Sequence, residues 1–466
     1  MTASAHRAAR LMLAAAIAVG LAASAAHGQA GRETTPGPWG GTLEVSPASP
    51  PRTGPARPPR GREAPGARPT AAAPRSPAGA QAAPTLATVL AAEVSGDDRR
   101  TRLAFDVAAP VAIEARSLAD PSRVIVDLPE VEFRLPTGTG QSAGGLISRY
   151  RFGLIEAGRS RIVLDTMGTV RIVRAEVVGP LSTGRFRLEI DLAPATAADV
   201  AAWQLAEAAA RSVAAEPVPA TPAMGIPQGR AGRRPVVVVD AGHGGIDPGA
   251  EGAAAIEKHI VLDVARHVER VLSATRRYEV VMTRTTDVFV SLDERLRISQ
   301  AHHADLFLSL HADSLPSKEL ARSVRGATVY TLAEQASDDL ARRMAEKENA
   351  VDLLAGLPLT GSGDDQVRAI LIDLLRRESA TYSQDFRRHL LAELRPRIAV
   401  AREPARSGPF KVLRQAGSPA VLIELGYMSN ADDERLMATS AWQGKVAQAI
   451  AAAVDAHFHT RTAGKR

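Results

Sequence analysis

The sequence predicts two folds in series: a small all-β sandwich, followed by an α/β domain whose twisted, mostly parallel sheet is flanked by helices. Two patterns carry this prediction. Between about residues 86 and 193, apolar and polar residues alternate in short runs separated by Gly, Pro, Asp and Ser, which is typical of strands with one buried face. From about residue 234 to 460, continuous apolar runs alternate with amphipathic segments, which is typical of a sheet covered by helices.

The first 85 residues are not expected to belong to either fold. Arg7 and Arg10 precede an apolar run from Leu11 to Ala23, and small residues follow as far as Gly28. This pattern predicts a Sec-type signal peptide over residues 1–28, with an uncleaved anchor as the alternative. Residues 31–84 contain thirteen prolines and seven Arg against three Glu, so we expect a disordered Pro/Ala/Arg-rich linker over 29–85.

The rest of the composition indicates an exported protein that works outside the cytoplasm. No later segment is long and apolar enough for a membrane span, so none is expected after signal cleavage, and the predicted location is the periplasm. A chain without cysteine has no disulfides and no thiolate ligands, so any metal must bind His, Asp or Glu. The net charge of +6 comes without a basic stripe interleaved with aromatics, which argues against nucleic acid and suits an anionic surface such as a cell wall.

The all-β region shows strands but no spacing of catalytic residues. Its clearest alternating runs are Leu103–Val107, Val124–Leu128, Ile162–Leu164 and Phe186–Ile190. We therefore predict a binding module over 86–193. A second linker, Ala-rich at first and then rich in Pro and Gly, is expected over 194–233.

The α/β region can be divided into elements by its apolar periodicity. The predicted strands are Val236–Val239, Val280–Thr283, Leu306–Leu310 and Ala420–Ile423. A helix is expected to open at Glu257, and Ser291-Leu-Asp-Glu294 has the capping-box spacing for another. Between Thr331 and Gly417 lies an insertion with three predicted helices, Glu334–Leu354, Asp365–Arg377 and Ser383–Arg397.

Four residues in this region suggest a reaction. His243, His311 and Glu424 follow or end predicted strands, and Glu257 begins a helix. In open α/β sheets the site lies beyond the carboxyl ends of the strands, so these side chains are expected to meet. Two histidines and a glutamate are a common ligand set for catalytic zinc, which keeps its fourth position for water, and a further glutamate is the base that a hydrolase needs.

His243, Glu257 and the nearby Asp240 also have plain structural interpretations. The glycine-rich loop around His243 suits a simple turn, although it lacks the spacing of a phosphate-binding loop. Glu257 by itself suits a helix dipole. Asp240 is either an N-cap or a group that orients a metal-bound histidine. Glu424 is the most informative single residue, because a carboxylate placed directly after Val-Leu-Ile is costly to bury unless it has a use.

Taken together, residues 235–460 resemble the zinc-dependent N-acetylmuramoyl-L-alanine amidases of the amidase_3 family, in their AmiA/AmiB/AmiC type. The matching motifs are Asp240-Ala-Gly-His-Gly-Gly245, Glu257-Lys258, Thr283–Asp287, Ser309-Leu-His-Ala-Asp313, Gly326–Tyr330 and Ile423-Glu-Leu-Gly-Tyr-Met-Ser-Asn430. The resemblance implies one Zn²⁺ per catalytic domain, bound by His243, Glu257 and His311, with Glu424 as the catalytic glutamate. The loop before Glu257 is a residue shorter than usual, which leaves Glu251 as a weaker substitute ligand.

The resemblance also implies a role in cell division. Asp120–Leu128, Arg149–Gly153 and Ser160–Asp165 resemble the AMIN domain, which implies targeting to peptidoglycan or to the division septum. The insertion at about 333–417 resembles a segment that closes the zinc cleft in related amidases until a LytM-domain-type activator moves it, and Glu346 or Glu348 would reach the metal. The alternative is that its helices simply cover the sheet. The expected activity is cleavage between N-acetylmuramic acid and L-alanine in septum splitting. The alternatives are a non-catalytic peptidoglycan-binding scaffold and a zinc peptidase acting within stem peptides.

Overall fold

The computed structural model describes residues 86–203, 205, 233–315, 317–357, 366–415 and 417–463. The expected signal peptide, the linker at 29–85 and most of the linker at 194–233 lie outside these residues. Among the helices that the structure does describe, none combines the length and the apolar character that a membrane crossing requires.

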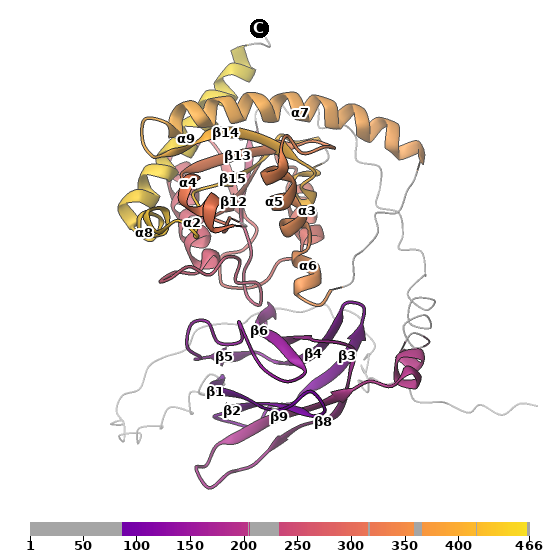
Figure 1. The fold of residues 1–466 in the computed structure, drawn as a ribbon. Coiled ribbons are helices and arrows are strands. Elements are labelled where there is room, and N and C mark those ends of the chain that lie inside the picture. The colour runs from indigo at the N-terminus through magenta and orange to yellow at the C-terminus, as the bar shows by residue number, and fades with distance from the viewer. Residues whose placement is uncertain are drawn as a thin grey trace, which may run out of the picture. The chain divides into compact units, whose positions relative to one another are not determined.

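The first folded region, residues 87–194, is a β-sandwich, as the alternating pattern predicts (Figure 1). One sheet has the order β5-β1-β2-β9-β8 and the other the order β3-β4-β7-β6. The strand bounds are β1 Ala87–Gly96, β2 Thr101–Val107, β3 Glu114–Ala119, β4 Ser122–Pro129, β5 Val131–Phe133, β6 Ile147–Glu156, β7 Arg159–Thr166, β8 Val170–Val178 and β9 Phe186–Pro194.

The two sheets of the sandwich are joined by one apolar core. The predicted alternation places Phe105 of β2 and Leu188 of β9 in the same buried cluster as Val124 of β4 and Ile162 of β7. Each such side chain contributes about 1.5–3 kcal/mol to folding. On the opposite faces of the same strands, Ile125 and Val163 are buried in a separate apolar cluster, and arginines pair with carboxylates, as Arg102 does with Asp191 and Arg161 with Asp127.

The second region is built on a six-stranded sheet of order β11-β10-β12-β15-β13-β14. All neighbouring strands are parallel except β13 and β15, which confirms the mostly parallel sheet. The strands are β10 Val236–Ala241, β11 Glu279–Met282, β12 Leu306–His311, β13 Ala327–Leu332, β14 Val400–Gly408 and β15 Ala420–Glu424. The helices are α2 Glu257–Ala274, α3 Leu292–Ala301, α4 Lys318–Ser323, α5 Asp339–Asn349, α6 Val351–Leu354, α7 Gln366–Leu394, η1 Lys411–Leu413, α8 Ala431–Met437 and α9 Ser440–Ala463.

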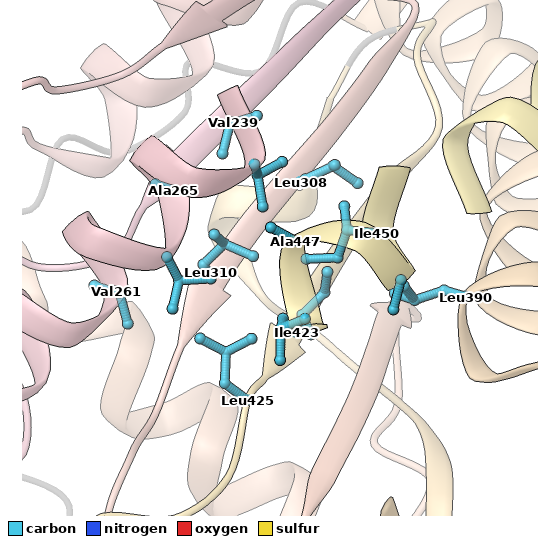
Figure 2. Packing of buried hydrophobic residues seen from close by; sticks show 14 of the residues in the cluster. Val239, Val261, Ala265, Leu308, Leu310, Leu390, Ile423, Leu425, Ala447 and Ile450 are labelled. Carbon is cyan, nitrogen blue, oxygen red and sulfur yellow. The ribbon is translucent and has the colours of Figure 1, made fainter. Parts of the chain in front are cut away.

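Helices cover both faces of the central strands, which explains their continuous apolar runs. Val239, Leu308 and Ile423 point to one face, where Figure 2 shows them against Ala265 of α2 and Ile450 of α9. The alternate residues of the same strands pack in a second cluster with α5 and η1. A strand with both sides buried has few polar side chains, and those it has, such as Asp240 and Ser309, lie close to its end.

Two predicted helix starts are confirmed, and the predicted helices of the insertion are divided differently in the structure. Helix α2 begins at Glu257, and the Ser291 side chain caps α3 by accepting a hydrogen bond from the Glu294 N–H. The helix predicted over Glu334–Leu354 begins only at Asp339 and is interrupted at Ala350, so it forms α5 and α6. The helices predicted separately over Asp365–Arg377 and Ser383–Arg397 are instead parts of a single helix, α7, although Asp365 itself lies outside the described residues. No strong helix breaker separates the two segments, so the helix continues through them.

Candidate metal-dependent active site

The site forms where three neighbouring parallel strands end. In the ladder between β12 and β15, His311 is paired with Glu424, and β10 lies on the other side of β12 with His243 two residues beyond its end. The N-terminus of α2 brings Glu257 to the same place. All four residues are at most 4 % exposed. The structure therefore brings together the four residues that the sequence singles out.

The loop that carries His243 depends on its glycines. His243 itself has a φ of 57°, in the left-handed region that non-glycine residues rarely adopt, and such strain is concentrated at functional sites. Gly242 lies so close to His311 that a Cβ there would come within 2.5 Å of the imidazole Cε1. A side chain at this position would push His311 out of place.

The ring nitrogens of His243 have different partners. Its Nδ1 lies 2.7 Å from Oδ2 of Asp247, four residues later in the same loop. Its Nε2 lies 3.0 Å from Oε1 of Glu257 and 3.2 Å from Nδ1 of His311. The distance from that Glu257 oxygen to His311 Nδ1 is 3.6 Å. The carboxylate on Nδ1 fixes the ring so that Nε2 faces the site, as in many metal-bound histidines.

Glu257 is held from two sides. Its Oε2 accepts a hydrogen bond of 2.7 Å from the Ala250 N–H, and its Oε1 accepts another of 2.7 Å from the Ala312 N–H. It is also the first residue of α2, where the helix dipole favours a negative charge. These contacts leave the carboxylate ionised and fixed, as a metal ligand must be.

Helix α5 reaches into the site from the predicted insertion. Oε2 of Glu348 lies 3.2 Å from His311 Nδ1, and its Oε1, although buried, has no hydrogen-bond partner among the described residues. The neighbouring Lys347 forms an ion pair with the buried carboxylate of Asp313. Glu346 instead lies on the solvent side, where it pairs with Arg342 of its own helix.

Two overlapping groups of side chains are close enough to hold a metal ion. One comprises His243, His311 and Glu348, and the other His243, Glu257 and Asp313; within each group the ligand atoms lie within 4.8 Å of one another. All of these residues are buried. The buried cluster at the strand ends can therefore bind a metal.

The electrostatics of the cluster favour a cation. Burial alone would lower the pKa of His243, but Glu257 and Asp247 outweigh this effect and raise it. Burial likewise opposes ionisation of Glu257, yet His243 and His311 hold the pKa of that carboxyl well below its usual range. Carboxylates surround the histidines on several sides, so positive charge is stabilised between them.

Glu424 has the properties of a proton carrier. Its side chain is fully buried, its Oε2 accepts a hydrogen bond of 2.9 Å from the Asp313 N–H, and its Oε1 has no partner in the described part of the chain. Burial raises the pKa of Glu424 to about 7; His311 opposes the rise and Glu257 adds to it. A group with this pKa can take and return a proton near neutral pH.

Asp240 lies below the site and supports its backbone. Its carboxylate accepts hydrogen bonds from the hydroxyls of Thr283 and Ser309, at 2.7 and 2.6 Å, and pairs with Arg295. Arg295 in turn donates a hydrogen bond of 2.8 Å to the carbonyl of His243. Asp240 therefore contacts His243 only indirectly, through Arg295. The carboxylate that orients the His243 ring is that of Asp247.

Several functional residues were missed by sequence reasoning. Asp247, Arg295 and Lys347 were not singled out, although the i,i+4 spacing of His243 and Asp247 in a glycine-rich loop was a usable signal. Glu251, the substitute ligand, pairs through its backbone with Ile256 and belongs to neither metal-binding group of the described residues. Of the two candidate glutamates, Glu257 is the one that lies beside His243 and His311.

The chain is similar to known proteins in both of its folded regions. Residues 237–456 match the family model described as N-acetylmuramoyl-L-alanine amidase, and residues 91–192 match the AMIN domain. The chain is 35% identical over 232 residues to the N-acetylmuramoyl-L-alanine amidase AmiA of Escherichia coli (strain K12), covering 49% of this chain and 78% of that protein. It is 30% identical over 385 residues to AmiC of Escherichia coli O6:H1 (strain CFT073), covering 80% of this chain and 90% of that protein.

These matches define the class of protein. The chain belongs to the N-acetylmuramoyl-L-alanine amidase family, and it combines an amidase domain with an N-terminal AMIN domain. Among solved structures it also matches the catalytic domain of CwlV, the amidase from Bacillus (Paenibacillus) polymyxa var. colistinus, at 29% identity and a TM-score of 0.32, covering 48% of this chain and 98% of that one.

Proposed function

We propose that this chain hydrolyses the amide bond between the lactyl group of N-acetylmuramic acid and the L-alanine of peptidoglycan stem peptides. The observation that carries the proposal is the convergence of His243, Glu257 and His311 with a fourth, proton-carrying residue, Glu424, in a chain of this family. We assign the metal as zinc, one ion in the domain.

The spacing of the three proposed ligand atoms is close to that of ligands around zinc, which supports this assignment. Zinc bonds of about 2.0–2.1 Å in a tetrahedron place neighbouring ligand atoms roughly 3.3–3.4 Å apart. His243 Nε2, Glu257 Oε1 and His311 Nδ1 lie 3.0, 3.2 and 3.6 Å from one another. Two imidazoles and one carboxylate also form a donor set typical of catalytic zinc. When bound, zinc would acidify a water molecule and polarise the amide carbonyl.

The protein's own side chains would handle the proton and the geometry. Glu424, with its pKa near 7, accepts the proton of the attacking water through its unpartnered Oε1 and returns it to the leaving nitrogen of L-alanine. The Asp313 N–H holds the other carboxylate oxygen, which fixes the direction of Oε1. Asp247 keeps Nε2 of His243 pointing into the site.

We further propose that α5 is autoinhibitory. Glu348 Oε2, at 3.2 Å from His311 Nδ1, stands at ligand distance from the same site, in the position that water and substrate need. Glu346 does not approach it. A helix that supplies a carboxylate to the fourth position keeps the resting enzyme inactive, and an activator of the LytM-domain type would have to withdraw it.

The setting we infer for this activity is the cell envelope. A Sec-type signal would export the chain to the periplasm, and the AMIN domain would recruit it to peptidoglycan at the division septum, where the activity would help to separate daughter cells. The binding-module pattern of residues 87–194 supports this role, because that region has a complete core of its own.

Product analysis tests the proposed reaction. Zinc-loaded Glu348→Gln protein, with its α5 contact removed, is incubated with purified peptidoglycan, and the released material is identified by mass spectrometry. We expect free stem peptides beginning with L-alanine. Peptides shortened from within would indicate a zinc peptidase, and peptidoglycan that is bound without any release would indicate a scaffold.

A further inference from the structure

Asp313 is a buried carboxylate with an incomplete set of partners. It lies two residues past His311, in the segment after β12, and its side chain is fully buried. One carboxylate oxygen, Oδ1, accepts from the Lys347 ammonium of α5, while the other, Oδ2, has no hydrogen-bond partner in the part of the chain that the structure describes. A buried carboxylate in this state strongly favours a cation beside it.

The backbone of Asp313 is tied to the catalytic groups. Its N–H donates a hydrogen bond of 2.9 Å to Glu424, and its carbonyl accepts one of 2.9 Å from the Met428 N–H. Its carboxylate belongs to a group in which the ligand atoms of His243, Glu257 and Asp313 lie within 4.8 Å of one another. Asp313 is therefore fixed beside both the proton carrier and the metal-binding side chains.

Helix α5 brings two opposite charges to this buried cluster. Glu348 brings its carboxylate to His311, and the preceding Lys347 brings its ammonium to Asp313. The buried cluster can thus accept an oxygen ligand beside His311, where Glu348 now lies. Next to it, the cluster can accept a cation beside Asp313, where Lys347 now lies.

Amide hydrolysis creates a cation at this point. Water adds to the carbonyl carbon, the carbon–nitrogen bond breaks, and both water protons end on the nitrogen, so the products at neutral pH are a carboxylate and an ammonium. The α-amino group of a free peptide has a pKa of about 7.7–8.0, which keeps most of the released amine protonated at pH 7. The amide carries no charge before the bond breaks.

We propose that Asp313 binds the amine of the L-alanine leaving group, and that Lys347 occupies this amine's place while α5 closes the cleft. This inference rests on the proposed amidase function. The contact would strengthen as positive charge develops on the nitrogen, which is the kind of interaction that lowers a barrier. In the closed state, the Glu348 carboxylate then takes the place of the amide oxygen, and the Lys347 ammonium takes the place of the amide nitrogen.

Direct binding tests this proposal without turnover. Full-length, zinc-loaded Lys347→Met/Glu348→Gln protein is titrated by calorimetry at pH 7 with L-alanyl-D-isoglutamine, and separately with propionyl-D-isoglutamine, which lacks the amino group. We expect the free amine to bind about tenfold more tightly, and we expect Asp313→Asn in the same background to remove this preference. Equal binding of the two ligands, or a preference that survives Asp313→Asn, would overturn the proposal.

A matched control and a second measurement keep the result interpretable. Arg342→Met/Glu346→Gln changes the same charges on the solvent side of α5 and should show no gain of amine binding over the unmodified chain. If Asp313→Asn fails to fold, the pH dependence decides. Binding to Asp313 weakens above about pH 8, where the ammonium loses its proton, whereas binding of the neutral amine to the metal would strengthen. Because no step requires hydrolysis, a failed product analysis leaves this test intact.

Discussion

The β-sandwich and the amidase domain both bury carboxylates, but they partner them differently. In the sandwich, Asp191 accepts hydrogen bonds from Arg100 and Arg102 on both of its oxygens, and Asp127 does the same with Arg116 and Arg161. At the buried metal-binding cluster of the amidase domain the pattern is different: each of three carboxyl groups has an oxygen with no partner among the described residues. They are Asp313, Glu348 and Glu424.

This difference separates charges that hold a fold together from charges that await a ligand. When a carboxylate has two arginine partners, its hydrogen bonds within the folded chain offset the free-energy cost of removing it from water. When one oxygen of a buried carboxylate has no partner, the free-energy cost of burial is offset only after a cation, a proton or a substrate binds there. The comparison predicts that substituting the incompletely paired carboxylates of the amidase domain changes its chemistry, and that substituting the arginine-paired carboxylates of the sandwich changes stability.

The largest effect is expected from His311→Ala. This change removes a ligand atom that faces both His243 and Glu257, so the chain should lose bound zinc and, with it, activity on peptidoglycan. Metal content by mass spectrometry and release of stem peptides are measured on the same sample. His267→Ala, which alters an exposed histidine of α2, is the control and should retain both. Full activity in metal-depleted His311→Ala protein would contradict the metal site.

Glu424→Gln should separate metal binding from catalysis. The amide side chain keeps the shape of the glutamate but cannot take a proton, so turnover in the Glu348→Gln background should fall by roughly 10²–10⁴-fold while the zinc content stays the same. Kinetics and metal analysis of the same preparation check this. Retained turnover would mean that another group carries the proton.

Glu348→Gln alone should raise the basal rate. If α5 closes the cleft with a coupling free energy of about 1–3 kcal/mol, removing its carboxylate should increase activity without an activator by roughly 5- to 150-fold. Glu346→Gln, two residues away on the solvent side of the same helix, should leave the rate unchanged. Equal rates for the two variants would show that the Glu348 contact does not restrain the enzyme.

The smallest effect is expected in the sandwich, from Asp191→Asn. Arg102 and Arg100 hold the pKa of Asp191 at about 2, below its ordinary value of 3.8. Because the folded pKa is the lower one, the stabilisation is complete above pH 3.8 and is lost as the pH falls towards 2. We expect a loss of about 1 kcal/mol at neutral pH, since both arginines are partly exposed.

Hydrogen exchange in β2 and β9 of the full chain measures this loss locally. The difference between Asp191→Asn and the unmodified protein should disappear near pH 2. Glu176→Gln, which affects an exposed pair with Arg174, should change exchange by less than about 0.5 kcal/mol of stability. Reduced peptidoglycan hydrolysis in the folded Asp191→Asn protein would contradict the division of roles between the two regions.

The sequence predicts the fold well because its periodicity is strong. The buried strands β10, β12 and β15 are continuous apolar runs, and His311 and Glu424 interrupt them at their ends, so both the sheet and its polar edge could be found. The merging of two predicted helices into α7 shows the limit: apolar periodicity locates helical segments, but a junction without Gly or Pro does not reveal whether the helix continues.

The rest of the site depends on contacts between distant segments. Lys347 meets Asp313 from 34 residues away, and Arg295 reaches the His243 carbonyl from 52 residues away. The local pattern of α5 does distinguish its two glutamates. Glu348 lies on the same face as the buried residues Leu340, Ala341, Met344 and Ala345, whereas Glu346 falls outside this apolar stripe. This periodicity is a signal that could have singled out Glu348 from the sequence.

The most direct test of the central claim is X-ray absorption at the zinc edge, measured on the zinc-loaded full chain and on its Glu348→Gln variant. We predict two imidazole nitrogens in both, two carboxylate ligands in the unmodified protein, and one carboxylate with a water-derived oxygen in the variant. A zinc environment without histidine, or one in which water already binds beside a single carboxylate before Glu348 is changed, would contradict a metal site closed by α5.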